Sequence, residues 1–390
     1  MFFSVHNLVK YFKIIFNLLQ YRTAKLLSIV SYSSKFLGPP KGYYKNAKEF
    51  FNERKLQNNI ILLEKSYHNS NDCCEKEILI IPNCRINYDP WGFITPDDKL
   101  LFEESSCFGP DPDRHWIFKK HKFANLVKLS GKTLFLSSRK NYWHLLTDEL
   151  VLLELLKSNG IKLEEFSHLI CEDYPFENGQ VLHEIFNINN QKKISLQKNK
   201  HVECEELYLL SGSYKLSQKG TFMVRKRLLN WHLKQNRNQN IKFIDKIIVS
   251  RSCSNTRRWI NERQCTAKLI DFGFKVINPT NLTLSDTITI FANAKFIIGP
   301  HGAGLTNCIF AKSGTVVIEI RSEKQFGEYS SAQCYEELSN ILNLKHYVFK
   351  CKSIERKDLR GRSIEDADLI PSVKDLLSFV KSIFDKSNID

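Results

Sequence analysis

A glycine-containing turn after a short apolar run is the stretch of this sequence best suited to chemistry. Residues 296–298 are typical of a strand buried on both faces of a sheet, and a Gly-Pro pair ends the run. Gly302 and Gly304 let the backbone approach a ligand, because glycine tolerates positive φ and has no Cβ. A helix that begins near Ala303 directs its free N–H groups and the positive end of its dipole at the same point, which favours a phosphate group there.

The spacing of these glycines differs from the two common glycine-rich nucleotide motifs. Gly299, Gly302 and Gly304 do not fit G-x-G-x-x-G, and Leu305 stands where a P-loop has lysine. The pattern therefore disfavours a dinucleotide dehydrogenase or an ATPase. From the glycines alone, a tight turn without a ligand is an equal alternative.

A second candidate site lies on a predicted helix that Asn141 opens as N-cap. The helix continues through the apolar run 150–156, and Gly160 follows its end. His144 and Asp148 are four residues apart and share one helix face, where the carboxylate can orient and polarise the imidazole. A histidine held in this way is a candidate general base. The polar face of an ordinary packed helix explains the same pattern.

Arginines form the third candidate group. Arg251 directly follows a predicted strand, and Arg257 and Arg258 stand near the start of the next helix. Guanidinium groups pair with phosphate oxygens, although a single surface arginine is usually solvated. In a parallel sheet ligands bind beyond the carboxyl ends of the strands, where Arg251, His301 and Glu319 all fall.

The elements that would position these residues alternate regularly in the second half of the chain. Strands are predicted over 244–250, 274–278, 296–298, 315–320 and 345–350, with helices over 259–271, 285–294 and 372–384. This alternation predicts a parallel sheet with helices on both faces. The first half has strand patterns at 77–82, 132–138, 168–171 and 207–211, whose order the pattern does not define.

Asp111 and Asp113 spell Asp-x-Asp, a pattern that holds a divalent cation in some enzymes that use sugar diphosphates. Two carboxylates one residue apart share a cation only where the backbone turns both of them inward. Prolines stand beside and between them and no apolar strand precedes them. We therefore predict a solvated turn rather than a metal site.

The composition is that of a globular protein with excess positive charge. Hydrophobic residues make up 42% of the chain and charged residues 25%. The length of 390 residues predicts two domains. The net charge of +15 favours anionic partners such as nucleotides and phospholipid surfaces. Nucleic acid is disfavoured, because the basic residues are spread along the chain without a finger-type spacing. The eleven cysteines lack a framework spacing and predict free thiols of a reducing compartment.

The predicted N-terminal helix, residues 1–30, is apolar and basic with one polar stripe. Its uncharged runs, such as 14–21, are too short to span a bilayer, which needs roughly 20 apolar residues. The pattern suits an amphipathic helix at a membrane interface, and a helix packed on the protein fits it equally. Residues 31–44 read as a linker.

Together these motifs resemble glycosyltransferase family 61. The resemblance rests on Asn-Tyr-x-His-x-x-x-Asp at 141–148, Ser-Arg at 250–251, Arg-Arg-x-x-Asn-Glu at 257–262 and Gly-Pro-His-Gly-Ala-Gly-Leu-Thr-Asn at 299–307, followed by Val-Val-Ile-Glu. It implies an α/β fold of the GT-B type with two Rossmann-like domains, of which the C-terminal one binds the donor. The expected boundaries are an acceptor-side domain at 45–240, a donor domain at 241–350 and a docking C-terminal helix within 351–390.

The resemblance also implies a nucleotide-sugar donor whose diphosphate lies at the glycine turn. The substrate-binding residues carried over are Asn141, Arg251, Arg258, Asn261, Glu262, His301, Gly302, Ala303, Gly304, Thr306, Asn307 and Glu319. Because N–H groups and cationic side chains balance the diphosphate, neither a divalent metal nor another cofactor is expected. Glu319 would accept from ribose hydroxyls, while Asn261 and Glu262 would position the sugar or fix Arg258.

The implied chemistry is inverting transfer. His144, oriented by Asp148, would deprotonate the acceptor hydroxyl as it attacks the anomeric carbon. The expected acceptor is a glycan or lipid-linked glycan of surface or capsular polysaccharide synthesis. We expect a bacterial cytoplasmic enzyme with peripheral membrane contact through 1–30, or an enzyme of the Golgi or ER lumen if the source is eukaryotic. The alternatives are a catalytically silent relative that binds a nucleotide sugar or a glycan, and a hydrolase, which leaves the glycine turn unexplained.

Overall fold

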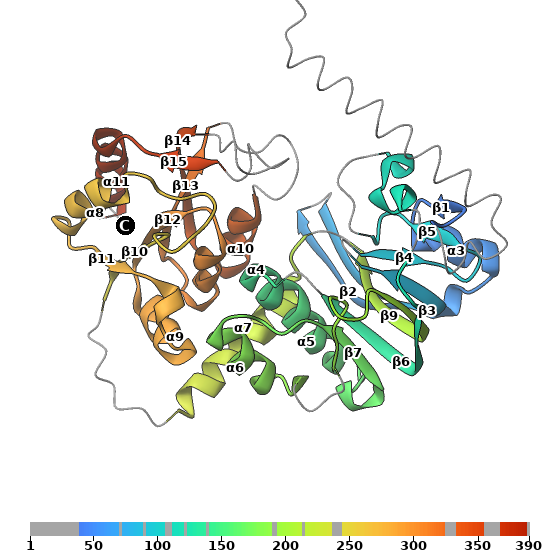
Figure 1. Ribbon diagram of the computed structural model, residues 1–390. Helices are drawn as coiled ribbons and strands as arrows, with labels where there is room; N and C mark the ends of the chain where they lie inside the picture. Colours follow the sequence, from blue (N-terminus) through green and yellow to red (C-terminus); the bar gives the residue numbers. More distant parts are fainter. Residues whose placement is uncertain are drawn as a thin grey trace, which may run out of the picture. The chain divides into compact units, whose positions relative to one another are not determined.

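The computed structural model describes residues 39–69, 72–88, 91–105, 111–120, 123–137, 140–188, 193–212, 215–235, 244–323, 333–354 and 367–387. The predicted helix at 1–30 and most of the predicted linker at 31–44 lie outside them. The described chain forms two compact units (Figure 1). Of the described residues, those within 1–139, 155–173 and 187–213 form unit 1, and those within 140–154, 174–186 and 214–390 form unit 2. In the described part of the chain, no helix combines the length and the apolar character needed to cross a bilayer.

Unit 2 is built on a six-stranded sheet in the order β11-β10-β12-β13-β14-β15. Its strands are β10 (Lys246–Val249), β11 (Lys275–Ile277), β12 (Phe296–Pro300), β13 (Val316–Ser322), β14 (Lys345–Ile354) and β15 (Asp368–Ile370). All neighbours pair in parallel except β15, which is antiparallel to β14. The predicted parallel sheet in the second half of the chain is confirmed.

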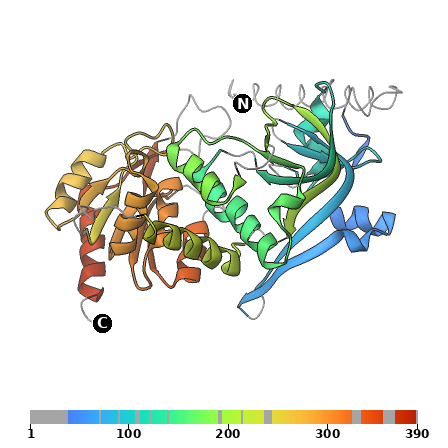
Figure 2. The same ribbon diagram turned by 90° about the horizontal axis from the view of Figure 1, so that it is seen from below.

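Helices cover both faces of this sheet. On one face, Leu269 and Val380 pack against Ile318 of the central strand β13. These two residues belong to α8 (Glu262–Ile270) and α11 (Val373–Ser387). The opposite face carries α7 (Gln218–Leu233), α9 (Leu284–Asn293), the 3₁₀ helix η8 (Ala303–Phe310) and α10 (Cys334–Leu342). Figure 2 shows α7 running alongside the helices of this second face, and it contacts both α9 and η8. Because side chains alternate across a strand, Glu319 points to this second face.

The strand order reverses at the centre of the sheet. From β10 the chain moves outward to β11 and then returns to the other side of β10 to form β12. Ligands of such sheets bind in the crevice beyond the carboxyl ends of the strands at this reversal. The two segments that leave β10 and β12 there begin with Ser250-Arg251 and His301-Gly302.

Unit 1 contains a nine-stranded sheet in the order β1-β5-β4-β3-β9-β6-β7-β8, with β2 paired to β3. The strands are β1 (Gly42–Tyr44), β2 (Ile60–Asn69), β3 (Asp72–Asn87), β4 (Gly92–Ile94), β5 (Lys99–Leu101), β6 (Val127–Ser137), β7 (His168–Cys171), β8 (Lys193–Ile194) and β9 (His201–Gly212). Helices α3 (Ala47–Arg54), α4 (Tyr142–His144), α5 (Leu150–Ser158) and α6 (Glu177–Ile185) complete the first half of the chain.

Only part of this first sheet has the arrangement expected of a Rossmann-like domain. Strands β9, β6, β7 and β8 are parallel neighbours, with α5 and α6 in the connections between them. Strands β2, β3, β4 and β5 form antiparallel ladders instead. Their connections are too short for the crossover that parallel neighbours require. The sheet of the first half is therefore mixed, with parallel strands in one part and antiparallel strands in the other.

Candidate active site

The glycine turn is shaped by the close approach of an arginine. Gly302 has φ +153°, and a Cβ placed on it would lie 1.6 Å from Nη1 of Arg251. Only glycine leaves room for the guanidinium here. The helix expected after the turn begins at Ala303, although it is a 3₁₀ rather than an α helix. The strand before it extends two residues further than predicted, because Gly299 and Pro300 pair with β13.

Two backbone N–H groups at the start of η8 are available to a ligand. The first hydrogen bond within this helix is donated by the N–H of Leu305 to the carbonyl of Gly302, at 2.9 Å. The N–H groups of Ala303 and Gly304 precede that bond, and both residues are partly exposed. Together with the positive end of the helix, they favour an anion beside the Arg251 guanidinium.

Arg251 is held by its own loop. Its Nη2 donates to Oγ of Ser254 at 2.7 Å and to the carbonyl of Thr256 at 2.8 Å, and its Nη1 donates to the carbonyl of His301 at 3.3 Å. The carboxylate of Glu262 accepts from the Arg251 N–H at 3.3 Å and from the Ser250 hydroxyl. Glu262 therefore fixes the segment that carries Arg251.

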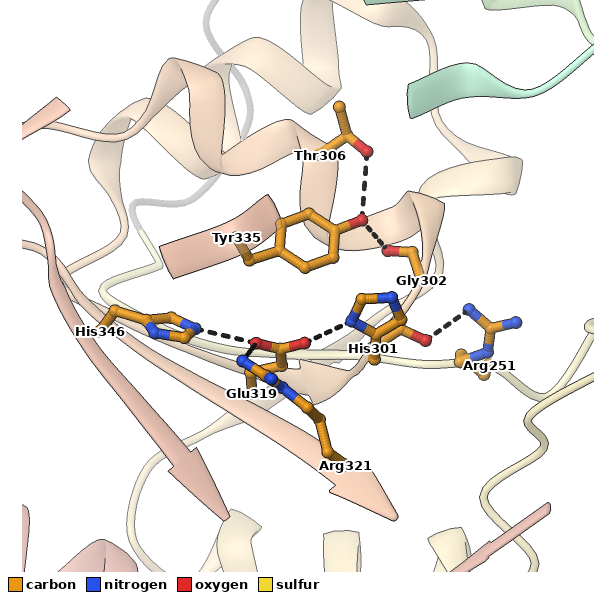
Figure 3. A network of polar contacts seen from close by, with 8 residues as sticks. All are labelled: Arg251, His301, Gly302, Thr306, Glu319, Arg321, Tyr335 and His346. Carbon is orange, nitrogen blue, oxygen red and sulfur yellow. Dashed lines mark hydrogen bonds and ion pairs between the residues drawn. The ribbon is translucent and has the colours of Figure 1, made fainter. Parts of the chain in front are cut away.

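A buried histidine–glutamate pair lies directly before the turn (Figure 3). Nδ1 of His301 is 2.5 Å from Oε1 of Glu319. Oε2 of Glu319 accepts from Arg321 and from His346, both at 2.9 Å. Burial alone would raise the pKa of Glu319, but these donors outweigh burial and lower it to about 2. Burial lowers the pKa of His301. A neutral His301 that donates Nδ1–H to an ionised Glu319 fits both directions.

This geometry differs from the role expected for Glu319. The side chain has no exposed surface, and its oxygens already accept three hydrogen bonds, so a ribose hydroxyl cannot reach it. Glu319 instead orients His301, which as a neutral ring adds no charge to the site.

Arg258 and Asn261 contact strand β15 and the residue that follows it. The Arg258 guanidinium donates to the buried carboxylate of Asp368 through Nε at 3.0 Å and Nη2 at 2.5 Å. Asn261 donates to the carbonyl of Pro371 at 2.8 Å. The carboxylate that fixes Arg258 is thus Asp368 rather than Glu262, and both side chains hold β15 and its exit against the start of α8.

The predicted histidine–aspartate dyad is formed. Asn141 caps the helix as predicted, because its Oδ1 accepts from the N–H of Trp143 at 2.8 Å. Nδ1 of His144 is 2.7 Å from Oδ2 of Asp148, and their side chains are 24% and 45% exposed. Residues Leu145–Glu149 form one turn of π-helix, a distortion found frequently at functional sites. The dyad is therefore open to an incoming substrate.

The dyad belongs to the same compact unit as the glycine turn, although the sequence boundaries placed it in the first domain. The hydroxyl of Tyr142 donates to Oδ1 of Asn307 at 2.8 Å, and Nδ2 of Asn307 donates to the carbonyl of Gly304 at 3.0 Å. Trp143 packs edge-on against Tyr335, with ring centroids 5.0 Å apart. Asn307, expected to bind substrate, thus links the dyad helix to η8.

Arg257 was named among the candidate arginines, but Arg321, His346 and Tyr335, which belong to the surroundings of the His301–Glu319 pair, were not predicted. The charges of Arg257 and Arg321 both act to lower the pKa of His301. Arg321 and Glu319 share one strand face, so the two-residue period of β13 could have indicated Arg321. His346 and Tyr335 come from β14 and α10, and no sequence pattern linked them to the turn.

A buried acid lies behind the dyad. Glu149 is 1% exposed and accepts a 2.5 Å hydrogen bond from Tyr174, and burial raises its pKa to about 8. Because the folded protein binds this proton more tightly than the unfolded chain, the contribution of Glu149 to stability is complete only below its unfolded pKa of roughly 4.3, and it is lost as the pH rises through about 8.

We expect the Glu149→Gln variant to become more stable relative to wild type as the pH rises from 5 to 9, with the free energy of unfolding measured in urea. A stability difference that does not change with pH would contradict this burial effect.

The Asp-x-Asp pattern forms the solvated turn that we predicted. Residues Pro112–Arg114 form a 3₁₀ turn capped by Asp111, whose Oδ1 accepts from the N–H of Asp113 at 3.1 Å. Both aspartates are exposed. Within the described ranges, no three His, Cys, Asp or Glu side chains gather in a way that could hold a metal ion.

Fold and site define an α/β protein with an anion-attracting turn at the strand reversal of a parallel sheet and a histidine–aspartate dyad in the same unit. The family Glycosyltransferase 61 matches residues 110–318, which is more than half of the 390 residues. The chain therefore belongs to glycosyltransferase family 61 and is a glycosyltransferase. A comparison with curated proteins found no match.

Proposed function

We propose that this glycosyltransferase moves a sugar, with inversion at the anomeric carbon, from a nucleotide-sugar donor to a hydroxyl of a glycan acceptor. The observation that carries the proposal is the packing of Arg251 against Gly302 at the strand reversal. There a guanidinium, two free N–H groups and a helix N-terminus converge on one point. This convergence supports unit 2 as the donor-binding unit of the GT-B type of organisation that we propose.

The donor diphosphate accepts hydrogen bonds from the N–H groups of Ala303 and Gly304. Arg251 supplies positive charge, and its loop contacts keep the guanidinium beside the turn. As the bond from the anomeric carbon to the diphosphate breaks, negative charge develops on the leaving oxygen. Preorganised donors stabilise that charge without a divalent metal.

His144 is the proposed base. With Nδ1–H donated to Asp148, Nε2 carries the lone pair of the neutral ring, and we assign to it the proton of the acceptor hydroxyl. The acceptor oxygen forms a bond to the anomeric carbon from the side opposite the diphosphate, which leaves with the bonding electron pair. Asp148 stabilises the imidazolium that results. The dyad and the turn share unit 2, so unit 2 carries both chemical roles.

Unit 1 is left to bind the acceptor in this proposal. We propose that the acceptor is a glycan or lipid-linked glycan of surface or capsular polysaccharide synthesis. We propose that the enzyme acts on the cytoplasmic side of the membrane, and its net charge of +15 would favour contact with an anionic membrane surface.

A thermal-shift panel tests the donor site directly. The purified chain is heated with UDP, GDP, CDP, TDP, CMP or NAD, each with and without EDTA. A ligand present at a hundredfold excess over its Kd stabilises the folded state by about 2.7 kcal/mol. We expect one nucleoside diphosphate to raise Tm equally in both conditions. A shift that requires a divalent cation contradicts metal-independent transfer, and no shift with any nucleotide favours a catalytically silent relative.

A further inference from the structure

Tyr335 makes the contact with the glycine turn that no motif indicated. Its hydroxyl donates to the carbonyl of Gly302 at 2.6 Å and lies 3.4 Å from Oγ1 of Thr306 (Figure 3). The residue is 3% exposed. Burial raises the pKa of the phenol well above its ordinary value, so Tyr335 keeps its proton at any working pH.

The bond to Gly302 has a geometric consequence for ligand binding. In a trans peptide the C=O and the following N–H point in opposite directions. A carbonyl of Gly302 that is held toward Tyr335 therefore turns the N–H of Ala303 away from Tyr335, toward the partly exposed side of the turn. The same carbonyl also accepts from the N–H of Leu305 at 2.9 Å, so Tyr335 is the second of two donors that fix this peptide plane.

The ring of Tyr335 makes two further contacts. Its centroid is 5.2 Å from that of His301, and 5.0 Å from that of Trp143, which directly precedes the proposed base. Both pairs are edge-on, an arrangement that favours a fixed ring position. One side chain thus contacts the segment before the turn, the turn itself and the helix that carries His144.

We propose that Tyr335 is a positioning residue for donor binding, which sets the peptide plane between Gly302 and Ala303 through its hydroxyl and holds the His144 helix through its ring. This inference rests on the proposed function, because the N–H that it aims is the one assigned to the diphosphate. It assigns to α10 a part in the site that the glycine motif alone does not contain.

Tyr335→Phe separates the two contributions, because it removes the hydroxyl and keeps the ring. We expect the Kd of the nucleoside diphosphate found in the thermal-shift panel to rise roughly three- to tenfold, as for the loss of one hydrogen bond. Because the Ala303 N–H is also proposed to stabilise the leaving diphosphate, we expect kcat at saturating donor to fall as well, by no more than the same factor. Calorimetric titration and steady-state kinetics measure the two quantities on the full chain.

The matched control is Tyr44→Phe in unit 1. Tyr44 is also buried, and its hydroxyl also donates hydrogen bonds, to Glu53 and Asp97. We expect this control to leave nucleotide affinity unchanged. An unchanged Kd in Tyr335→Phe, or an equal rise in both variants, overturns the inference while the proposed function stands. Failure of the wild-type chain to bind any nucleoside diphosphate overturns the proposed function and this inference together.

Discussion

Replacing His144 with alanine is expected to lower the transfer rate by about 10²- to 10⁴-fold, the usual contribution of a positioned general base. Nucleoside diphosphate affinity should change little, because His144 acts on the acceptor hydroxyl. Asp148→Asn should also lower the rate, because the asparagine amide can donate to Nδ1 and hold the imidazole in the tautomer whose Nε2 cannot accept a proton. Transfer kinetics at saturating donor and calorimetric titration of the nucleotide measure the two effects separately.

A matched histidine distinguishes loss of a base from loss of a helix contact. His232 also lies on a helix of unit 2, and its Nδ1 is 2.9 Å from Oγ of Ser285. It belongs neither to the histidine–aspartate dyad nor to the glycine turn. His232→Ala should transfer sugar at close to the wild-type rate. An equal loss of nucleotide affinity in His144→Ala and Arg251→Ala would contradict the division of roles between base and donor site.

Gly302→Ala is expected to weaken nucleoside diphosphate binding by at least tenfold. The added methyl would lie 1.6 Å from Nη1 of Arg251, so either the guanidinium or the turn must move. Both movements separate the positive charge from the N–H groups of η8. Titration of the variant with the nucleoside diphosphate measures the loss, and circular dichroism checks that the fold persists.

Gly314 supplies the control for backbone strain. It also has positive φ, at +84°, but a Cβ on it would meet nothing within 4 Å. Gly314→Ala should therefore lower stability modestly, by roughly 1 kcal/mol, and leave nucleotide affinity unchanged. If Gly302→Ala binds the nucleotide as Gly314→Ala does, the close approach of Arg251 has no part in binding.

Unit 2 was largely predictable because parallel strands buried on both faces read as continuous apolar runs. The runs at 296–298 and 315–320 correspond to β12 and β13, and the helix start at Ala303 is correct. Helix α7 was missed, because residues 215–242 read as a polar, basic stretch. Its buried stripe is narrow, with Val224 and Leu228 the apolar residues within it.

Unit 1 was less predictable, because its pairing is decided by connection length rather than by strand composition. Strand β3 pairs with β2, β4 and β9, and the apolar run at 77–82 indicated neither partners nor direction.

At the site, the sequence located the residues better than their partners. It placed Arg258 correctly near the start of a helix, but Glu319 lies within β13, which continues to Ser322, rather than beyond the end of that strand. It had no means to pair Arg258 with Asp368, 110 positions away, or Glu319 with His346. Such contacts depend on which strands become neighbours. Tyr335 was missed for the same reason.

Hydrogen–deuterium exchange of the full chain, with and without the nucleoside diphosphate selected by the thermal-shift panel, tests the central claim most directly. The N–H groups of Ala303 and Gly304 precede the first hydrogen bond of η8 and should exchange rapidly in the free protein. The account predicts that the nucleotide slows exchange at 302–306 and in the loop 250–257. Protection confined to unit 1, with no change in either segment, would contradict it.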